Sequence, residues 1–121
     1  MSAPLLAAAA LGVFLAMAHS YLGERYILTR LFRRNEVPKL FGGTEFTKNT
    51  LRFAWHITSV FGLGFAAMLA VLASGGATPR AQAQIISGTC AACGLVALVG
   101  SRGRHLSWVV FFAIAALAWP T

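Results

Sequence analysis

Apolar residues are gathered in four runs along the chain, and the segments between the runs are polar and mostly basic. The runs cover residues 4–23, 53–73, 84–101 and 105–120. An α-helix needs about 20 predominantly apolar residues to cross a hydrocarbon core about 30 Å thick. The first two runs reach that length unaided, and the last two are shorter and are extended by polar flanking residues. The pattern predicts a single all-α domain, residues 1–121, built as a four-transmembrane-helix bundle of a polytopic membrane protein.

The composition supports a lipid environment. Apolar residues make up 58% of the chain and charged residues 11%, whereas about a quarter of the residues of a soluble domain are charged. Because small domains leave much of their surface exposed, a soluble fold of this length could not hide so much apolar surface. The tripeptide at residues 16–18 resembles a signal-cleavage site, but no basic residue precedes the first run, and the run is longer than a signal-peptide core. We therefore expect a retained membrane helix.

Basic residues are distributed unequally between the connections. The chain carries ten Lys and Arg against three Asp and Glu, a net charge of +7. Nine of the ten basic residues lie in residues 24–52 and 101–105, and the remaining connection has only Arg80. Basic loops stay on the cytoplasmic side of a membrane. We therefore predict a multi-pass protein of the cell (inner) membrane, with both basic connections cytoplasmic and both termini outside.

The basic residues also indicate the expected partners. Anionic lipid head groups attract basic segments that lie next to membrane helices. The side chains expected to contact these head groups are Arg30, Arg33, Arg34, Lys39, Arg102 and Arg104. No nucleic-acid-recognition motif accompanies the charge, so nucleic acid is not an expected partner. A homo-oligomer or a larger membrane complex stays open as an assembly.

The first connection is predicted to be amphipathic and partly helical. Apolar side chains are mixed with arginines over residues 26–34, so the first helix is expected to continue beyond the membrane surface. Pro38 and the Gly42–Gly43 pair then break the chain. Thr44 followed by Glu45 is typical of an N-cap and first helical turn. The second helix should therefore begin about two turns before it enters the bilayer.

The residues that could support chemistry gather on the predicted cytoplasmic side. His19 and His56 lie inside apolar runs, and His105 stands at the entrance of the fourth run. The three glutamates of the chain belong to the same side. An ionisable residue within a membrane span is by default a candidate for function.

Helical spacing predicts where two of these histidines point. Residues three, four or seven apart share a face of a helix, and small residues at that spacing mark contacts between membrane helices. The residues that share these faces are Ala8, Gly12 and Ala16 with His19, and Ser59, Gly62, Ala66 and Ala70 with His56. Both histidines should therefore face a pocket between the first, second and fourth helices. Its expected ligand-binding residues are His19, Tyr26, Arg52, His56, Ser59, His105 and Trp108.

One interpretation of this pocket is structural. Each histidine would donate to a carbonyl or a serine, and Arg52 would pair with Glu24 or Glu45. Glu24 lies about 140° around the helix from His19, at about 100° per residue. It is therefore expected to neighbour Arg52 or Arg104. Such polar groups hold membrane helices together by around one kcal/mol each.

Two further interpretations place a ligand in the pocket. His19, His56 and His105 could bind a transition metal, or two imidazoles from facing helices could clamp a b-type haem. Alternatively, Arg52, His56 and Trp108 could hold an organic anion or a quinone-like lipid at the membrane interface, where arginine recognises carboxylate or phosphate bidentately. The sequence itself leaves the cofactor open.

The function most consistent with these features is that of a non-enzymatic ligand- or cofactor-binding protein, or of a subunit of a membrane assembly. A homo-oligomeric carrier of small molecules and a small membrane enzyme acting on a lipid or quinone-like head group are the alternatives. No motif in the chain identifies a family.

Cys90 and Cys93 form a CxxC motif inside the third apolar run. In a thioredoxin-like setting this motif is typical of redox chemistry. Here it is surrounded by small residues, and a thiol buried among apolar groups is inert. We therefore expect the two cysteines to serve close helix packing.

Overall fold

The chain folds into helices joined by short turns. The computed structural model describes all residues 1–121 and contains five α-helices and one π-helix. The elements are α1 (Ala3–Leu22), the π-helix η1 (Gly23–Leu28), α2 (Thr29–Arg33), α3 (Glu45–Ala73), α4 (Pro79–Ser101) and α5 (Ser107–Ala118). No strand forms, and the only β-type contact is an isolated bridge between Leu40 and Gly43. The all-α prediction is confirmed.

Three helical segments are long and apolar enough to cross a membrane. They are Ala3–Arg33, which joins α1, η1 and α2 into one rod of 31 residues, Glu45–Ala73 with 29 residues, and Pro79–Ser101 with 23 residues. α5 has only 12 residues. At 1.5 Å per residue it is about 18 Å long, short of a hydrocarbon core about 30 Å thick. A fourth crossing therefore stays a prediction.

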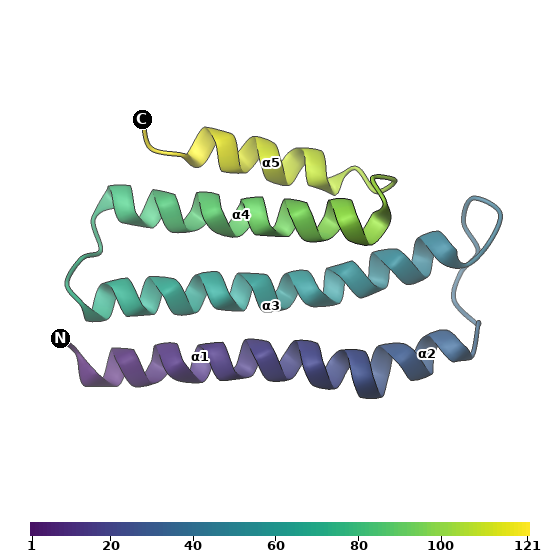
Figure 1. Cartoon of the computed structure of the whole chain (residues 1–121), viewed down its shortest axis with the longest axis horizontal. Coiled ribbons are helices and arrows are strands. Elements are labelled where there is room, and N and C mark those ends of the chain that lie inside the picture. Colours follow the sequence, from purple (N-terminus) through teal and green to yellow (C-terminus); the bar gives the residue numbers. More distant parts are fainter.

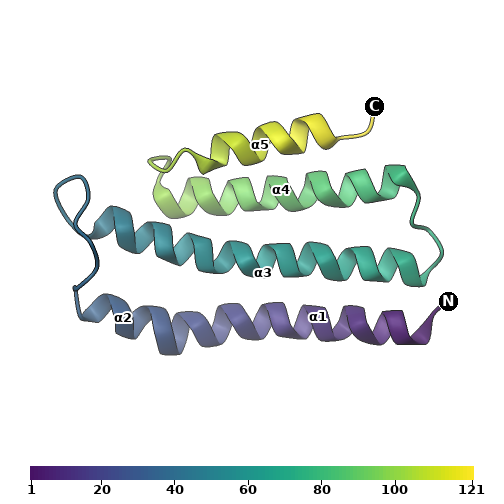
Figure 2. The same ribbon diagram turned by 180° about the vertical axis from the view of Figure 1, so that it is seen from behind.

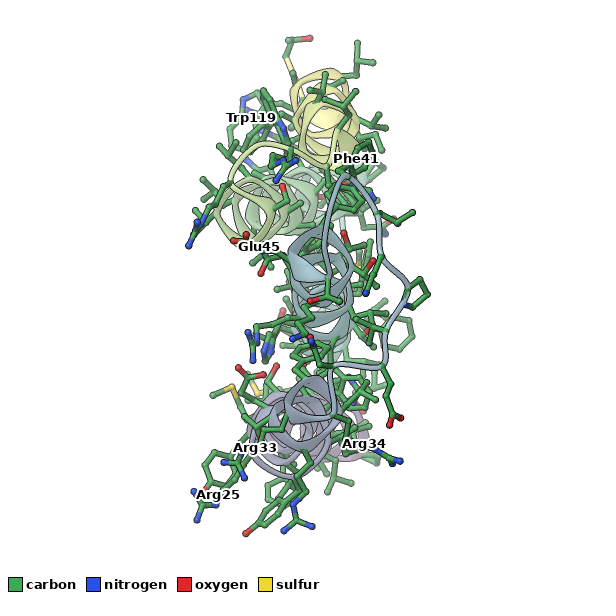
Figure 3. The ribbon with its side chains drawn as sticks, turned by 90° about the vertical axis from the view of Figure 1, so that its right-hand side faces the viewer. Arg25, Arg33, Arg34, Phe41, Glu45 and Trp119 are labelled. Carbon is green, nitrogen blue, oxygen red and sulfur yellow. The ribbon has the colours of Figure 1, made fainter.

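The helices form an open layer. α1 packs on α3, α3 on α4, and α4 on α5, so that α1 and α5 lie at opposite edges (Figures 1 and 2), as the end view also shows (Figure 3). This arrangement corrects the predicted closed bundle, which would bring the first and last helices together. Lipid tails are as apolar as the side chains, so the hydrophobic effect does not force membrane helices to close. Only 16 of 121 residues are buried.

The layer has one strongly basic end. The connection between α2 and α3 and the turn between α4 and α5 lie at the same end of the layer, and both termini lie at the other (Figure 1). Nine of the ten basic residues fall in or beside these two connections, and Arg80 lies at the start of α4, at the opposite end. We call these the basic end and the terminal end. The basic residues that are unequally distributed along the sequence are therefore also gathered at one end of the structure.

Small residues bring α1 close to α3. A Cβ added at Gly12 would lie 3.2 Å from the Cβ of Ala66, and one added at Gly62 would lie 3.3 Å from the Cβ of Ala16. The two predicted small-residue seams therefore face each other in antiparallel register. Larger side chains at the two glycines would separate the helices, because the methyl group of the facing alanine already fills the space.

The connection between α2 and α3 turns sharply and leads into the predicted helix start. Asn35 and Phe41 both have positive φ, at 55° and 56°. The hydroxyl of Thr47 donates to the carbonyl of Pro38 at 2.8 Å and ties the turn to the next helix. α3 then begins at Glu45 as predicted. Thr44 occupies the N-cap position, but its hydroxyl donates to the Asn35 side chain at 3.0 Å instead of capping the helix.

The π-helix η1 interrupts the first rod at Gly23. The N–H of Thr29 bonds to the carbonyl of Glu24, five residues back. Gly23 is buried against Trp55, and a Cβ at Gly23 would collide with the indole ring. The indole Nε1 in turn donates to the carbonyl of His19 at 2.9 Å. π-helical turns are rare and are frequently found at functional sites.

Replacing Gly23 by Ala should destabilise the protein. The indole of Trp55 cannot withdraw freely, because it is bonded to the His19 carbonyl and stacked on the His19 ring at 4.5 Å. Overpacking of this kind costs about 1–3 kcal/mol. Gly88 is the control, since a Cβ there meets nothing within 4 Å, and Gly88→Ala should stabilise α4 by up to about 1 kcal/mol. Thermal unfolding in detergent, followed by circular dichroism, measures both; equal effects of the two variants would contradict the tight contact.

Candidate functional site

A charged cluster lies where η1 meets α3, near the basic end. The Glu24 carboxylate lies 2.9 Å from Nε of Arg52. The second carboxylate oxygen lies 3.7 Å from Nε2 of His56. The carboxylate therefore faces both a guanidinium and an imidazole. Glu24 was expected to neighbour Arg52 or Arg104, and the structure places it beside Arg52. Glu45, the other carboxylate expected for Arg52, instead pairs with Arg102 at 3.4 Å.

The cluster continues as a line of hydrogen bonds into the contact between α1 and α3. The other ring nitrogen of His56, Nδ1, lies 2.9 Å from the hydroxyl of Ser20. The Ser20 hydroxyl is 2.5 Å from that of Ser59, which is buried. We call this set the polar chain; its members are Arg52, Glu24, His56, Ser20 and Ser59.

Helical spacing explains how the polar chain assembles. On α3, Arg52, His56 and Ser59 stand four and three residues apart and so share one face. On the facing rod, Ser20 and Glu24 stand four residues apart. Ser20 was not among the residues predicted from the sequence. The available signal was its spacing, because it extends the small-residue series of α1 by one further step of four.

The charged members of the polar chain are only half-buried. The side chains of Arg52, Glu24 and His56 are 40%, 38% and 29% exposed. The Arg52 guanidinium also lies over the ring of Phe32, with 5.0 Å between Cζ and the ring centre. Toward Glu24, Arg52 uses Nε, and its terminal nitrogens have no hydrogen-bond partner in the chain. These nitrogens form the part of the guanidinium that binds carboxylate or phosphate bidentately.

Two open hollows flank the charged cluster. The first is formed by α1, η1 and α2, and its lining residues are Met17, Ser20, Tyr21, Glu24, Arg25, Thr29 and Arg33. The second lies between α3 and α4, and its lining residues are Arg52, Phe53, His56, Leu95, Val96, Val99 and Gly100. Figure 3 shows that Arg25 and Arg33 point to the same side of the rod, whereas Arg34 points to the other. The ion pair of Glu24 and Arg52 joins the two hollows.

The other two histidines lie apart from the polar chain. The ring of His19 stacks on Trp55 at an interplanar angle of 3°, and its Nε2 is buried without a hydrogen-bond partner. His105 packs against Phe53, with 5.1 Å between ring centres, and its Nδ1 contacts the hydroxyl of Ser107 at 2.9 Å. The structure contains no group of three or more His, Cys, Asp or Glu that could hold a metal ion. The predicted three-histidine site, with His56 as its third member, is therefore not formed.

Two further predicted pocket residues point elsewhere. Tyr26 is exposed and lies between the guanidinium groups of Arg25 and Arg30, which are 5.6 Å and 5.8 Å from its ring centre. The indole of Trp108 donates to the carbonyl of Gly103 at 3.1 Å. The structure does not bring the seven predicted pocket residues together. The pocket required the last helix beside the first, and α5, which carries Trp108, lies on the far side of α4 from α1.

The basic side chains predicted to contact lipid head groups are all exposed. They are Arg30, Arg33, Arg34, Lys39, Arg102 and Arg104. Arg34 forms an ion pair with Glu36 at 3.5 Å, and Arg104 lies over the ring of Phe41 at 6.0 Å. Such exposed contacts contribute little to stability, so these side chains are available to partners outside the chain.

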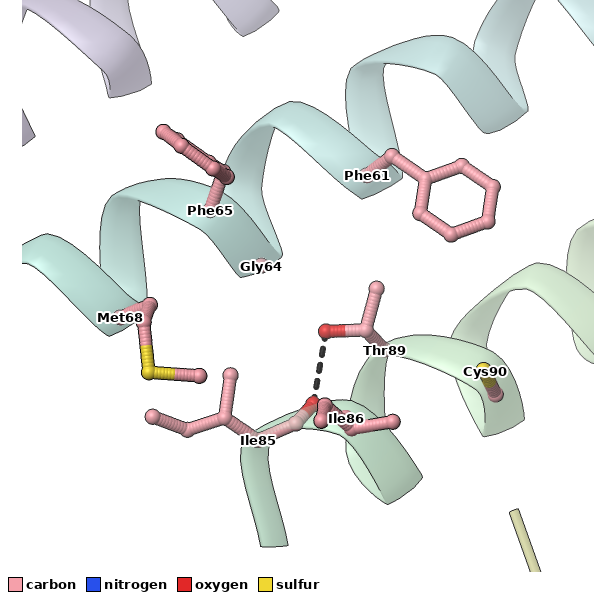
Figure 4. Close-up of a pocket in the computed structure, with 8 residues that line it drawn as sticks. All are labelled: Phe61, Gly64, Phe65, Met68, Ile85, Ile86, Thr89 and Cys90. Carbon is pink, nitrogen blue, oxygen red and sulfur yellow. Dashed lines mark hydrogen bonds between the residues drawn. The ribbon is translucent and has the colours of Figure 1, made fainter. Parts of the chain in front are cut away.

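The face of the layer opposite Arg52 is apolar and grooved. Phe61 stands nine residues after Arg52 and so lies about 180° around α3 at about 100° per residue. Figure 4 shows the groove between α3 and α4, lined by Phe61, Gly64, Phe65, Met68, Ile85, Ile86, Thr89 and Cys90. The hydroxyl of Thr89 is turned back to the carbonyl of Ile85 at 2.7 Å. No charged group reaches this groove.

The two cysteines lie within the helix packing around α4. Both Cys90 and Cys93 are buried and free. Nearby, a Cβ at Gly94 would collide with the ring of Phe112, so α4 and α5 approach closely there. The stretch therefore acts as a close-packing surface, as predicted.

The order of groups in the polar chain invites comparison with a nucleophilic triad. Glu24, His56 and Ser20 present a carboxylate, an imidazole and a hydroxyl in sequence, as such triads do. However, the 3.7 Å between carboxylate and imidazole exceeds a hydrogen bond. A nucleophilic serine also needs free donors for an oxyanion, and the backbone around Ser20 is helical. The geometry suits binding and proton movement better than acyl transfer.

Neither a protein-family model, nor a curated protein, nor a solved structure matches the chain. Fold and site define a helical protein with three apolar helices of membrane-spanning length and a charged cluster at one end.

Replacing Glu24 by Gln should lower stability, because Arg52 and His56 would then face a neutral amide. Since the three side chains are partly exposed, the expected loss is about 1 kcal/mol. Glu36→Gln is the matched control. Glu36 pairs with Arg34 at 3.5 Å with both side chains 69% exposed, and its loss should stay within about 0.5 kcal/mol. Thermal unfolding in one detergent compares the variants, and an effect of Glu36→Gln as large as that of Glu24→Gln would show that the polar chain does not stabilise the fold.

Proposed function

We propose that the protein is a multi-pass protein of the inner membrane that crosses the bilayer four times and binds an anionic amphiphile without catalysing a reaction. Both termini lie outside, and the connections 24–52 and 101–105 are cytoplasmic. Support comes from the segregation of nine basic residues at one end of the layer, away from Arg80 and the termini, since basic loops remain on the cytoplasmic side. The short α5 completes the fourth crossing together with its polar flanks.

Cysteine labelling in intact cells tests the orientation. In a background with Cys90 and Cys93 replaced by Ala, a cysteine at Gly76 should react with a membrane-impermeant maleimide without permeabilisation. A cysteine at Lys39, which is exposed in the basic connection, should react only after permeabilisation. Reaction of the Lys39 position in intact cells would reverse the orientation, and equal reaction at both positions would exclude a crossing by α3.

The anion site is proposed at the charged cluster. The observation that carries it is the bonding of Arg52: Nε is bound to Glu24, and the terminal nitrogens of the guanidinium make no hydrogen bond within the chain. Glu24 holds the guanidinium in place, and the ring of Phe32 supports it. A carboxylate or phosphate head group would accept two hydrogen bonds from the free edge of the guanidinium.

The surroundings of the cluster favour an anion. Arg25 and Arg33 line the adjoining hollow together with Glu24, so with Arg52 this region carries three guanidinium groups and one carboxylate. On the α4 side the hollow is lined by Leu95, Val96 and Val99 (residues that suit an acyl chain). A ligand with an anionic head and an apolar tail matches both parts.

Lipid retention tests this site. Protein in nanodiscs with equal amounts of phosphatidylglycerol and phosphatidylcholine is released for native mass spectrometry, and bound lipids are counted. Arg52→Gln should lower retained phosphatidylglycerol about tenfold, in keeping with the loss of a charge-assisted bidentate contact. Arg80→Gln removes the same charge at the terminal end and should leave retention unchanged.

The outcomes distinguish a specific lipid site at Arg52 from attraction of lipid by the net positive charge. If Arg52→Gln and Arg80→Gln reduce retention equally, net charge alone attracts the lipid and the site is wrong. Arg52→Lys keeps the charge but loses the planar fork, so a specific site predicts retention between those of the wild-type protein and Arg52→Gln.

A further inference from the structure

Three arginines of the first rod border one small cleft that no acidic side chain lines. The cleft has a volume of about 190 Å³, and its lining residues are Arg25, Tyr26, Thr29, Arg30 and Arg33. The three arginines are exposed, and Arg25 and Arg33 point to the same side of the rod (Figure 3). We call this site the arginine cleft.

The π-helix η1 brings the arginines together. At about 100° per residue, Arg25 and Arg30 would stand about 140° apart on an uninterrupted α-helix. A π-helical turn instead pairs residues five apart, and here both guanidinium groups lie over the ring of Tyr26, at 5.6 Å and 5.8 Å from its centre. Arg33 follows Arg30 by three residues and so shares its face. The cleft therefore depends on a rare helical form that is frequently found at functional sites.

The chain supplies no counter-ion to the arginine cleft. Each of its three glutamates pairs with another arginine: Glu24 with Arg52 at 2.9 Å, Glu36 with Arg34 at 3.5 Å and Glu45 with Arg102 at 3.4 Å. None of the cleft arginines forms an ion pair within the chain. Like charges in one cleft repel one another, and an anion from outside the chain would remove that repulsion.

The charge of the cleft favours a ligand with more than one phosphate. Guanidinium groups bind phosphate oxygens bidentately. A single phosphodiester carries one negative charge and leaves two of the three arginines unmatched, whereas two phosphates on one head group come closer to the charge of the cleft. Basic pockets beside membrane helices bind head groups of this kind.

An apolar surface leads from the cleft along the rod toward the terminal end. Met17 and Tyr21 stand eight and four residues before Arg25, and both are exposed. Together with Arg25 and Arg33 they line the hollow that adjoins the arginine cleft. Acyl chains of a lipid whose head group occupies the cleft would lie along these side chains, whereas a soluble diphosphate would leave them uncovered.

We infer that the arginine cleft binds a membrane lipid whose head group carries two phosphates, with its phosphates on the three guanidinium groups and its acyl chains along Met17 and Tyr21. The ring of Tyr26 positions two of the guanidinium groups. The site goes beyond the one proposed at Arg52, which belongs to α3 and does not line the cleft.

Lipid competition tests the site. Cardiolipin, which has two phosphates, is the probe, and phosphatidylglycerol, which has one, is the competitor. Protein is placed in phosphatidylcholine nanodiscs that contain twice as much phosphatidylglycerol as cardiolipin by mole, so that both lipids present equal phosphate. Native mass spectrometry of the released protein counts the lipids retained, and cardiolipin should be retained in preference to phosphatidylglycerol.

Arg30→Gln should lower the retained cardiolipin about fivefold, the contribution of one arginine beside an anionic head group. Arg30 is exposed and forms no ion pair, so its replacement should leave the fold intact. Arg34→Gln is the matched control and should leave retention unchanged. It removes the same charge from the same rod, but Arg34 pairs with Glu36 and points to the other side (Figure 3).

A second pair of variants keeps every charge. Tyr26→Leu removes the ring that lies between two guanidinium groups and should lower cardiolipin retention about twofold to fivefold, the range of a cation–π contact at an exposed site. Tyr26→Phe keeps the ring and should retain cardiolipin as the unmodified protein does. Equal retention by Tyr26→Leu and Tyr26→Phe would show that the ring does not position the arginines.

Three results would overturn the inference. They are equal losses from Arg30→Gln and Arg34→Gln, the absence of any preference for cardiolipin at equal phosphate, and saturable calorimetric binding of pyrophosphate to protein in phosphatidylcholine nanodiscs that Arg30→Gln removes. The last result would assign the cleft to a soluble diphosphate. In an Arg52→Gln background, Arg30→Gln should still lower cardiolipin retention about fivefold, so the failure of either lipid site is seen separately.

Discussion

The close approach of α1 to α3 determines the rest of the structure. Every fourth residue of the first rod, Gly12, Ala16, Ser20 and Glu24, faces α3. At the first two positions a glycine of one helix faces an alanine of the other, Gly12 against Ala66 and Ala16 against Gly62, so the helices approach closely. A serine adds little more volume than an alanine, so the hydroxyl pair continues the contact without separating the helices. The polar chain is thus a continuation of the packing seam in the same register.

The π-helix lies at the last of these four positions, Glu24. A glutamate is too long for the tight spacing that the small residues set. Gly23, one residue earlier, lets the Trp55 ring fill the space beside the rod, and the indole bonds to the carbonyl of His19. The wider turn of η1 then carries Glu24 to Arg52 instead of into the seam. A rare helical form is tolerated here because the contacts on both sides hold it.

Helix positions and local pairings follow from the sequence, whereas the arrangement of helices does not. The small-residue spacing predicted that the faces of Gly12 and of Ala66 contact other helices, and the structure pairs them with each other; Glu24 and Arg52 were among the expected pairs. The predicted pocket included Trp108 from the last helix, and a correct prediction would have required knowing which helices are adjacent. In lipid, no hydrophobic penalty distinguishes an open layer from a closed bundle, so periodicity alone cannot choose between them. The π-helix was equally hidden, since the ring that packs against it, Trp55, belongs to another helix.

The open layer gives the two faces different chemistry. One face exposes a guanidinium and a carboxylate near the basic end, and the other exposes phenylalanine rings and small residues. A charged group costs several kcal/mol in the middle of a bilayer and much less near its surface, which explains why Arg52 lies close to the start of α3 and His56 only one turn further along. Between the faces the serine hydroxyls carry hydrogen bonding through the seam. Because a hydroxyl donates and accepts without bearing charge, Ser20 and Ser59 extend the hydrogen bonding of His56 into a seam of small residues that could not hold an ion.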